Sequence, residues 1–117
     1  MCIRDSFAGS GSVGIEALSR GAREAVFVDF AQECAECAER NAAWCGFDVP
    51  GRARAVCARV ESVLREPAAH GVDARPFDLV TVTPPYEQVV YAELVDALCA
   101  SPLVGEDTIV VLSLIHI

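Results

Sequence analysis

The segment Thr83-Pro84-Pro85-Tyr86 carries the residue types best suited to chemistry, and it directly follows the apolar run 77–82. A strand that meets two consecutive prolines ends there, because neither proline has an N–H to donate to the sheet. The Thr83 hydroxyl and the Pro84 carbonyl can accept hydrogen bonds from a planar exocyclic amine, and the Tyr86 ring can stack on the base that bears it. We therefore interpret the segment as an amine-binding turn. The structural alternative is a plain proline-rich turn with a packed tyrosine.

A second candidate is the glycine-rich turn Gly9-Ser10-Gly11-Ser12-Val13-Gly14, which satisfies the pattern G-x-G-x-x-G. It opens a predicted helix, and Asp29 stands 20 residues after Gly9 at the end of the next apolar run. This context is typical of a nucleotide site, where glycines admit the ligand close to the backbone and the acid accepts bonds from both ribose hydroxyls. The alternative is an ordinary strand–turn–helix connection with a solvated Asp29.

Two classes of cofactor fit these features. A dinucleotide would place its pyrophosphate at the helix N-terminus, whereas S-adenosylmethionine needs no phosphate site. The glycines do not discriminate between them. The Pro-Pro-Tyr segment favours S-adenosylmethionine, because methyl transfer to an exocyclic amine needs acceptors that hold the amine hydrogens, and hydride transfer does not. An NAD-dependent oxidoreductase domain and a noncatalytic binding domain of the same fold remain the rival hypotheses.

The elements that must position these residues alternate between short apolar runs and helical patterns. This alternation predicts an α/β fold of the Rossmann-like methyltransferase type, a mostly parallel sheet flanked by helices. Ligands of such sheets bind at the carboxyl ends of the strands. We expect strands at 25–29, 54–57, 77–82 and 107–112, helices at 12–20, 31–45, 60–66 and around 90–98, and a loop at 67–76. The only segment available to form a strand before Phe7 is 2–6, whose composition is poor for a central strand.

The length and the net charge of the chain limit the classes of protein to which it can belong. With 117 residues the chain makes one domain at most. We expect a single truncated domain over 1–117, incomplete at both ends, with 1–6 and 113–117 as non-native ends. No apolar run reaches the roughly 20 residues of a membrane helix. The formal charge of −8 argues against tight nonspecific binding to nucleic acid, although it does not exclude a nucleic-acid substrate.

The six cysteines raise the question of a metal or disulfide framework. Only Cys34 and Cys37 form a C-x-x-C pair, and neither histidine has a ligand spacing to it, so we expect no metal. Cys34, Ala38, Ala42 and Cys45 fall on one face of the expected helix, which favours apolar packing of the thiols in a reduced compartment.

The stretches Phe7–Ala22, 26–29, 77–80 and 84–86 together resemble the RsmD-like guanine-N2-methyltransferases of small-subunit ribosomal RNA. The resemblance spans nearly all of residues 7–112. It implies S-adenosylmethionine as cofactor, small-subunit ribosomal RNA as partner, and no membrane. The string Val-Thr-Pro-Pro-Tyr is similar to plastid and algal members, so the compartment implied is the bacterial cytoplasm or the chloroplast stroma.

The resemblance also implies residue roles. The cofactor-binding positions would be Asp5, Phe7, Gly9, Ser10, Gly11, Asp29 and Phe30, and the catalytic positions would be Thr83, Pro84, Pro85 and Tyr86.

Two positions depart from the family pattern. The family usually has Asp or Asn before Pro-Pro-Tyr, where this chain has Thr83, an uncharged and weaker acceptor. The family also tends to place an acid near position 59, beside the adenine, where this chain has Arg59, to which we assign no role. Methylation of adenine N6 or of a protein amide, which uses a similar segment, is a further alternative.

Overall fold

The computed structural model describes residues 2–6, 11–83 and 91–112 of this chain; for 2–6 and Tyr91 the description covers the backbone alone. Phe7, Gly9, Ser10, Pro84, Pro85, Tyr86 and the end 113–117 therefore lie outside the described residues, as does the expected helical position Val90.

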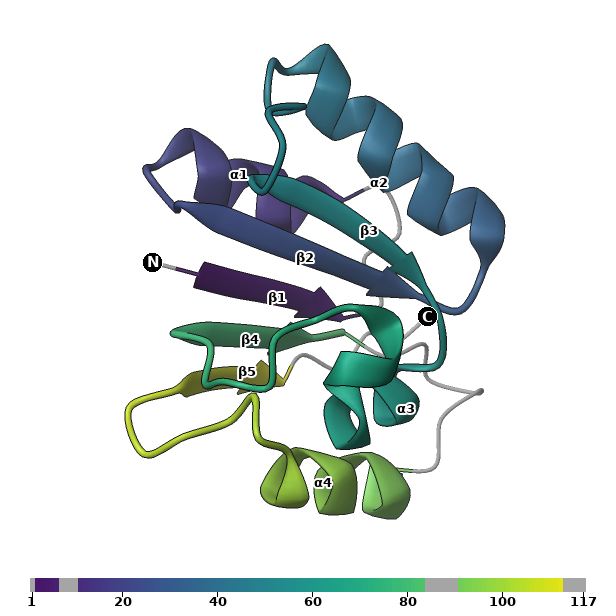
Figure 1. Ribbon diagram of the computed structural model, residues 1–117, viewed down its shortest axis with the longest axis vertical. Coiled ribbons are helices and arrows are strands. Elements are labelled where there is room, and N and C mark those ends of the chain that lie inside the picture. The colour runs from purple at the N-terminus through teal and green to yellow at the C-terminus, as the bar shows by residue number, and fades with distance from the viewer. Residues whose placement is uncertain (1, 7–10, 84–90, 113–117) are drawn as a thin grey trace.

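Within the described residues, five parallel strands form one sheet in the order β3-β2-β1-β4-β5 (Figure 1). The strands are β1 (Cys2–Ser6), β2 (Glu24–Asp29), β3 (Ala53–Cys57), β4 (Leu79–Val82) and β5 (Ile109–Leu112). The helices are α1 (Ser12–Ser19), α2 (Gln32–Trp44), α3 (Val60–Arg65) and α4 (Tyr91–Ala100), with a 3₁₀ turn at Pro67–His70. The parallel α/β architecture predicted from the sequence is confirmed.

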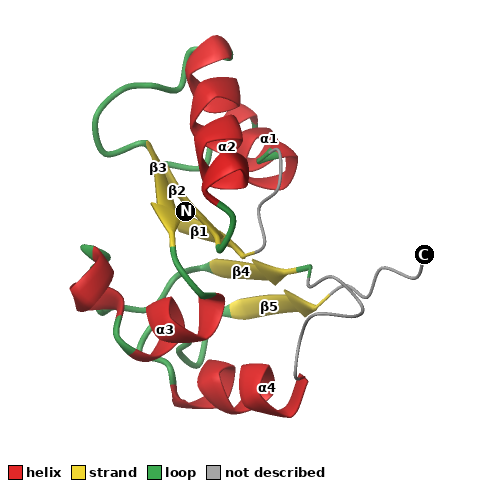
Figure 2. Ribbon diagram, turned by 90° about the vertical axis from the view of Figure 1, so that its right-hand side faces the viewer, coloured by secondary structure: helices red, strands yellow, loops and turns green. Residues whose placement is uncertain are grey.

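The helices cover the sheet from both sides, with α1 and α2 on one face and α3 and α4 on the other (Figure 2). The alternation of side chains along β2 explains both layers. Ala25 and Phe27 pack with α1 and α2, whereas Val26 and Val28 belong to the larger cluster toward α3 and α4. A strand that is buried on both faces is apolar throughout, as β2 is from 25 to 28.

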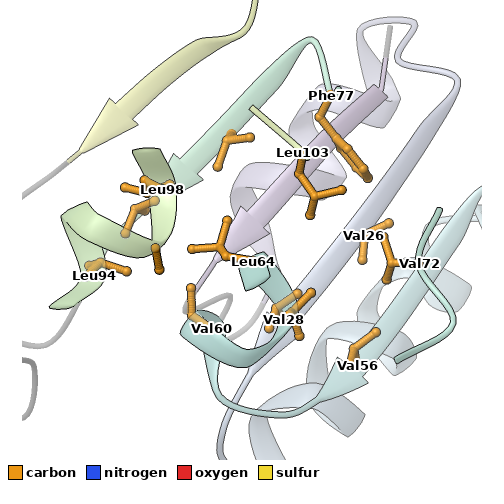
Figure 3. Packing of buried hydrophobic residues seen from close by; sticks show 14 residues of the cluster. Val26, Val28, Val56, Val60, Leu64, Val72, Phe77, Leu94, Leu98 and Leu103 are labelled. Carbon is orange, nitrogen blue, oxygen red and sulfur yellow. The ribbon is translucent and has the colours of Figure 1, made fainter. Parts of the chain in front are cut away.

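The larger cluster fills the space between the sheet and the helices α3 and α4 (Figure 3). Leu64 of α3, Leu94 of α4 and Val28 of β2 are fully buried members of this cluster. Phe77, which precedes β4, donates its N–H to the carbonyl of Leu103 at 2.8 Å and is also buried in this cluster. This packing therefore holds the residues just before β4 in place, and with them the position of β4 in the sheet.

The expectation that 2–6 is a poor strand was wrong. This segment is β1, the central strand, and it pairs with β2 on one side and β4 on the other. Two flanking strands supply hydrogen-bond partners on both edges, and this context outweighs the weak strand propensity of Arg-Asp-Ser. The expected loop 67–76 also contains the 3₁₀ turn, and the strands expected from 77 and 107 begin at Leu79 and Ile109.

The expectation that the thiols pack as apolar residues was also wrong for most of them. Cys45, Cys57 and Cys99 are exposed, and Cys34 and Cys37 are half-buried. The buried face of α2 is instead lined by Ala35, Ala38 and Ala42. Cys45 is the residue that caps the end of α2, so the helical face no longer directs it toward the sheet.

Among the described residues, no helix combines the length and the apolar character needed to cross a bilayer.

Candidate active site at the carboxyl rim of the sheet

Three chain segments leave the sheet at the same level of its carboxyl rim. Ser6, the last residue of β1, is in register with Val28 of β2 and with Val82 of β4. Ser6 is three residues before Gly9, the first glycine of the turn, in the sequence; Asp29 directly follows Val28, and Thr83 directly follows Val82. Because the strands are parallel and adjacent, the register brings the starts of all three candidate segments to one edge.

Asp29 is held at this rim by contacts on both sides. Its carboxylate Oδ1 accepts the N–H of Ala31 at 3.0 Å, and its backbone carbonyl accepts the N–H of Ala58 at 3.0 Å. The first bond fixes the turn into α2, and the second joins the end of β2 to the segment after β3. The side chain is half-buried, so the carboxylate has a fixed position and remains accessible from the rim.

Phe30 presents its ring to solvent beside Asp29. The side chain is 70% exposed, which is unusual for a phenylalanine in a rigid turn. Its carbonyl accepts the Cys57 thiol at 3.4 Å, so β3 supports the turn from the side. A flat apolar surface next to a fixed carboxylate suits a nucleoside, whose base can lie on the ring while its ribose meets the acid.

Gly11 and Gly14 lie at the start of α1, where close packing leaves no room for a side chain; they do not leave open space for a ligand. Gly11 has φ +82°, and a Cβ there would lie 2.9 Å from the Cβ of Ala38 on α2. A Cβ at Gly14 would overlap the ring of Phe27 on β2. The glycines therefore let the start of α1 pack closely against both α2 and the sheet. This is the helix–strand role that the third glycine of the pattern has.

The Thr83 side chain is half-buried at the end of β4, and its hydroxyl has no hydrogen-bond partner among the described residues. The neighbouring Thr81 is buried within the strand. The structure therefore brings Gly11, Asp29, Phe30 and Thr83 to one rim. Asp5 lies in β1 one residue before the rim; Phe7, Gly9, Ser10, Pro84, Pro85 and Tyr86 lie outside the described residues.

Two rim residues are not among the sites expected from the sequence. Arg59, which precedes α3, pairs with Glu61 at 3.9 Å; the Arg59 side chain is 68% exposed and that of Glu61 only 15%. A glutamate as little exposed as Glu61 is unusual at the edge of a candidate site. Its signal in the sequence is weak, because a glutamate in the first turn of a helix is common.

Cys34 of α2 lies close enough to Asp29 for the two to interact. Burial raises the pKa of the Cys34 thiol, and the negative charges of Asp29 and Glu33 raise it further. At neutral pH the thiol is therefore less ionised than an ordinary cysteine. Across the described residues, no group of three or more His, Cys, Asp or Glu side chains is arranged to hold a metal ion.

A pocket of about 260 Å³ opens at the opposite, amino rim of the sheet. Its arginines are engaged: Arg54 donates to the carbonyls of Gly71 and His70, and Arg75 lies 3.8 Å from Asp73. Charged groups of both signs line it in equal number, namely Arg23, Arg54 and Arg75 with Glu24, Asp73 and Asp78. The pocket therefore favours neither anionic nor cationic ligands, and it lies away from the candidate residues.

Comparison with protein families shows one match over most of the chain. The family described as Conserved hypothetical protein 95 matches residues 2–114. The chain belongs to this family. No curated protein matches the chain.

Solved structures of relatives share the fold of this family member. "Putative methyltransferase yhhF" from Escherichia coli is 26% identical, with a TM-score of 0.78, covering 97% of this chain and 59% of that one. A hypothetical protein from Thermus thermophilus is 36% identical, with a TM-score of 0.74, covering 96% of this chain and 60% of that one. The chain thus spans about three-fifths of the length of these two relatives.

A more distant structure, SMU.776 crystallised with S-adenosylhomocysteine, is 16% identical with a TM-score of 0.77 over 97% of this chain and 30% of that one. At this identity the likeness concerns the fold alone. The architecture of this family member therefore matches that of proteins that bind S-adenosylmethionine or its product.

Proposed function

We propose that this chain is the cofactor-binding part of an S-adenosylmethionine-dependent methyltransferase that acts on guanine N2 in small-subunit ribosomal RNA. The observation that carries the proposal is the register at the carboxyl rim, where Ser6 pairs with both Val28 and Val82. The name of the Escherichia coli relative supports methyl transfer, and the distant structure with S-adenosylhomocysteine supports the cofactor; neither concerns the acceptor. The choice of guanine N2 rests on the family resemblance of the glycine and Pro-Pro-Tyr segments.

The residues at the rim fit the proposed cofactor. Asp29 would accept hydrogen bonds from the two ribose hydroxyls, and Phe30 would cover one face of the adenine. Gly11 lets the start of α1 pack closely on α2 and β2. Asp5, Phe7, Gly9 and Ser10 would complete the site. When bound, S-adenosylmethionine supplies an electrophilic sulfonium methyl group.

The residues after β4 would hold the acceptor. The Thr83 hydroxyl, free of other partners among the described residues, would accept one hydrogen of the guanine amine, and the Pro84 carbonyl would accept the second. Pro85 would keep the turn rigid, and Tyr86 would stack on the base. The amine of a paired guanine is hidden in the helix, so the base would be presented unstacked. Catalysis would then consist mainly of positioning the amine in line with the methyl group.

The cofactor assignment is tested by calorimetric titration of the chain with S-adenosylhomocysteine and, separately, with NAD. We expect binding of the first only. Asp29→Ala should weaken that binding about 100-fold, since it removes two charge-assisted hydrogen bonds of about 1.5 kcal/mol each. Asp96→Ala, on the exposed face of α4, is the matched control and should bind normally. Tighter binding of NAD would identify the oxidoreductase rival.

The substrate assignment is tested by transfer of a labelled methyl group to small-subunit ribosomal RNA, followed by analysis of the nucleosides. We expect N2-methylguanosine. Label in N6-methyladenosine, or in protein, would point to the alternative acceptors. Binding of S-adenosylhomocysteine with no transfer to any of these acceptors would favour the noncatalytic domain.

A further inference from the structure

The outer ridge of α2 carries an aromatic side chain that no described part of the chain covers. Trp44, the only tryptophan of the protein, is the last residue of α2, and its side chain is 91% exposed. Large aromatic rings bury about 150–250 Å² in typical folded contexts, so one left in water is a feature to explain. In Figure 1, α2 lies at the border of the molecule with its outer side away from the sheet.

Arg40 lies one helical turn before Trp44 and therefore on the same ridge. Eight arginine side chains are described, and six of them have a partner: Arg20, Arg23, Arg52, Arg54, Arg59 and Arg75. Arg40 and Arg65 are the two without a hydrogen bond, ion pair or ring contact to the described residues. Of these two, Arg40 has an exposed aromatic neighbour at helical spacing.

A planar ring and a guanidinium that has no ion pair among the described residues, one turn apart, can bind a ligand that has both a flat face and a negative charge. A nucleotide of single-stranded RNA has this chemistry: its base stacks on an indole, and its phosphate meets an arginine. The guanidinium also offers five donors in a plane, which suits phosphate better than an isolated ammonium does.

We propose that Arg40 and Trp44 bind one unpaired nucleotide of the RNA substrate, with the base on the indole and the phosphate on the guanidinium. This inference rests on the proposed function, because it concerns the same RNA. α2 begins just after Asp29 at the carboxyl rim and is 13 residues long. At 1.5 Å per residue the contact lies about 20 Å from the methyl-transfer rim, so it anchors the RNA away from the target base.

The charge of the ridge predicts how this contact depends on salt. Glu36 and Glu39 are exposed near Arg40, and the chain as a whole carries −8. A single neutralised phosphate on single-stranded RNA gives a slope of about −0.7 in log K against log salt. We expect a slope of this size, with stacking supplying the rest of the binding. A slope several times steeper would indicate nonspecific polyelectrolyte binding and would contradict the proposal.

The experiment uses the unique tryptophan as a reporter. In a ¹H–¹⁵N spectrum of the 117-residue chain, the one indole N–H signal and the Arg40 Nε–H signal are followed during titration with a 12-nucleotide oligoadenylate. We expect both signals to move with one binding constant. Inorganic phosphate should move only the arginine signal. A basic leucine–lysine peptide that moves both signals when RNA moves neither would assign the ridge to a protein partner and overturn the proposal.

Variants can separate a loss of base stacking from a loss of folding, because Trp44 is too exposed to stabilise the fold. Trp44→Leu keeps an apolar side chain but removes the ring, and it should weaken RNA binding about 5- to 100-fold, read from the Arg40 signal. Trp44→Phe should restore most of the affinity. Arg65→Gln, at the other arginine without a partner among the described residues, is the control and should change nothing.

Calorimetry with S-adenosylhomocysteine separates this inference from the proposed function. Normal cofactor binding in Trp44→Leu together with weakened RNA binding is the expected pattern. Equal RNA binding by Trp44→Leu and the unchanged chain would refute the ridge contact while leaving the cofactor site intact. If the unchanged chain does not bind S-adenosylhomocysteine, the proposed function is refuted instead.

Discussion

Thr83 is the rim residue at which a substitution should change the chemistry most, because it has an uncharged hydroxyl where the resemblance to the guanine-N2-methyltransferases implies Asp or Asn. A hydrogen bond to a charged acceptor is worth about 1 to 1.5 kcal/mol more than one to a neutral acceptor. Thr83→Asp should therefore raise methyl transfer to guanine about tenfold. Measured turnover with saturating cofactor checks this.

Thr83→Val, which keeps the shape and removes the acceptor, is the paired control for Thr83→Asp. We expect its turnover to fall about tenfold with cofactor affinity unchanged. If Asp and Val at this position both leave turnover where it was, Thr83 does not contact the amine.

Cys34 gives a second prediction for a single side chain. Burial and the nearby charge of Asp29 raise the pKa of its thiol, so less thiolate is present at a given pH. With iodoacetamide at neutral pH, mass spectrometry should find Cys34 labelled more slowly than the exposed Cys45 and Cys99.

Asp29→Asn removes one of the causes of the raised pKa and should speed the labelling of Cys34, though not to the rate of Cys45, because burial remains. Cys99 on α4 serves as an internal standard. Faster labelling of Cys34 than of Cys99 in the unchanged chain would contradict a raised pKa.

At the scale of the elements, the contact between α1 and α2 depends on Gly11. Its φ of +82° disfavours a side chain, and a Cβ would also press on Ala38 at 2.9 Å. Gly11→Ala should lower the free energy of unfolding by about 1–2 kcal/mol for the left-handed backbone and about 1–3 kcal/mol more for the contact. Urea unfolding followed by circular dichroism measures this loss.

Gly46 provides the matched control, since its φ is +84° and nothing lies within 4 Å of the position of a Cβ. Gly46→Ala should show the backbone cost alone. Equal losses for the two variants would mean that α1 and α2 do not pack as closely as described.

The sequence predicted most helices and strands because their apolar patterns are local. Gly21, Gly46 and the two prolines mark where elements end, and the run 25–28 is apolar because both faces of β2 are covered. β1 could not be predicted in this way. Its pairing with β2 and β4 depends on neighbours that are distant in the sequence, and its own residues are not strongly strand-forming.

The sequence singled out candidate site residues but not how they are held. Motif spacing made Asp29 and Thr83 candidates, and the parallel fold predicted a common rim. The bond from Ala58 to Asp29 depends on the register of β2 and β3. The bond from Ala31 to Asp29 and the pair of Arg59 with Glu61 are local but depend on side-chain conformations that motif spacing does not specify. The exposure of Cys45 escaped prediction because a helical face tells which side is buried but not that Cys45 lies past the end of α2.

At the scale of the whole molecule, the two edges of the sheet differ. β3 is covered by α2 and carries Arg54, which ties it to the turn at Gly71. All four residues of β5 are apolar and exposed: Ile109 at 64%, Val110 at 38%, Val111 at 48% and Leu112 at 44%. An edge strand of this kind pairs readily with other chains.

We therefore expect concentration-dependent association of the 117-residue chain, and Val111→Lys should reduce it by placing a charge on the edge. Static light scattering over a concentration series measures the change. Val49→Lys, an equal change at an exposed loop position, should have little effect. If Val49→Lys reduces association as much as Val111→Lys, the added charge and not the β5 edge is responsible.

The most direct test of the account is a map of the backbone amide signals that shift when S-adenosylhomocysteine saturates the chain. We expect the largest shifts at Gly11, Phe30, Ala58 and Thr83, and none at Arg54 and Gly71 beside the pocket of the opposite rim. Shifts centred on that pocket, or shifts of the glycine segment without Thr83, would contradict a shared site at the carboxyl rim.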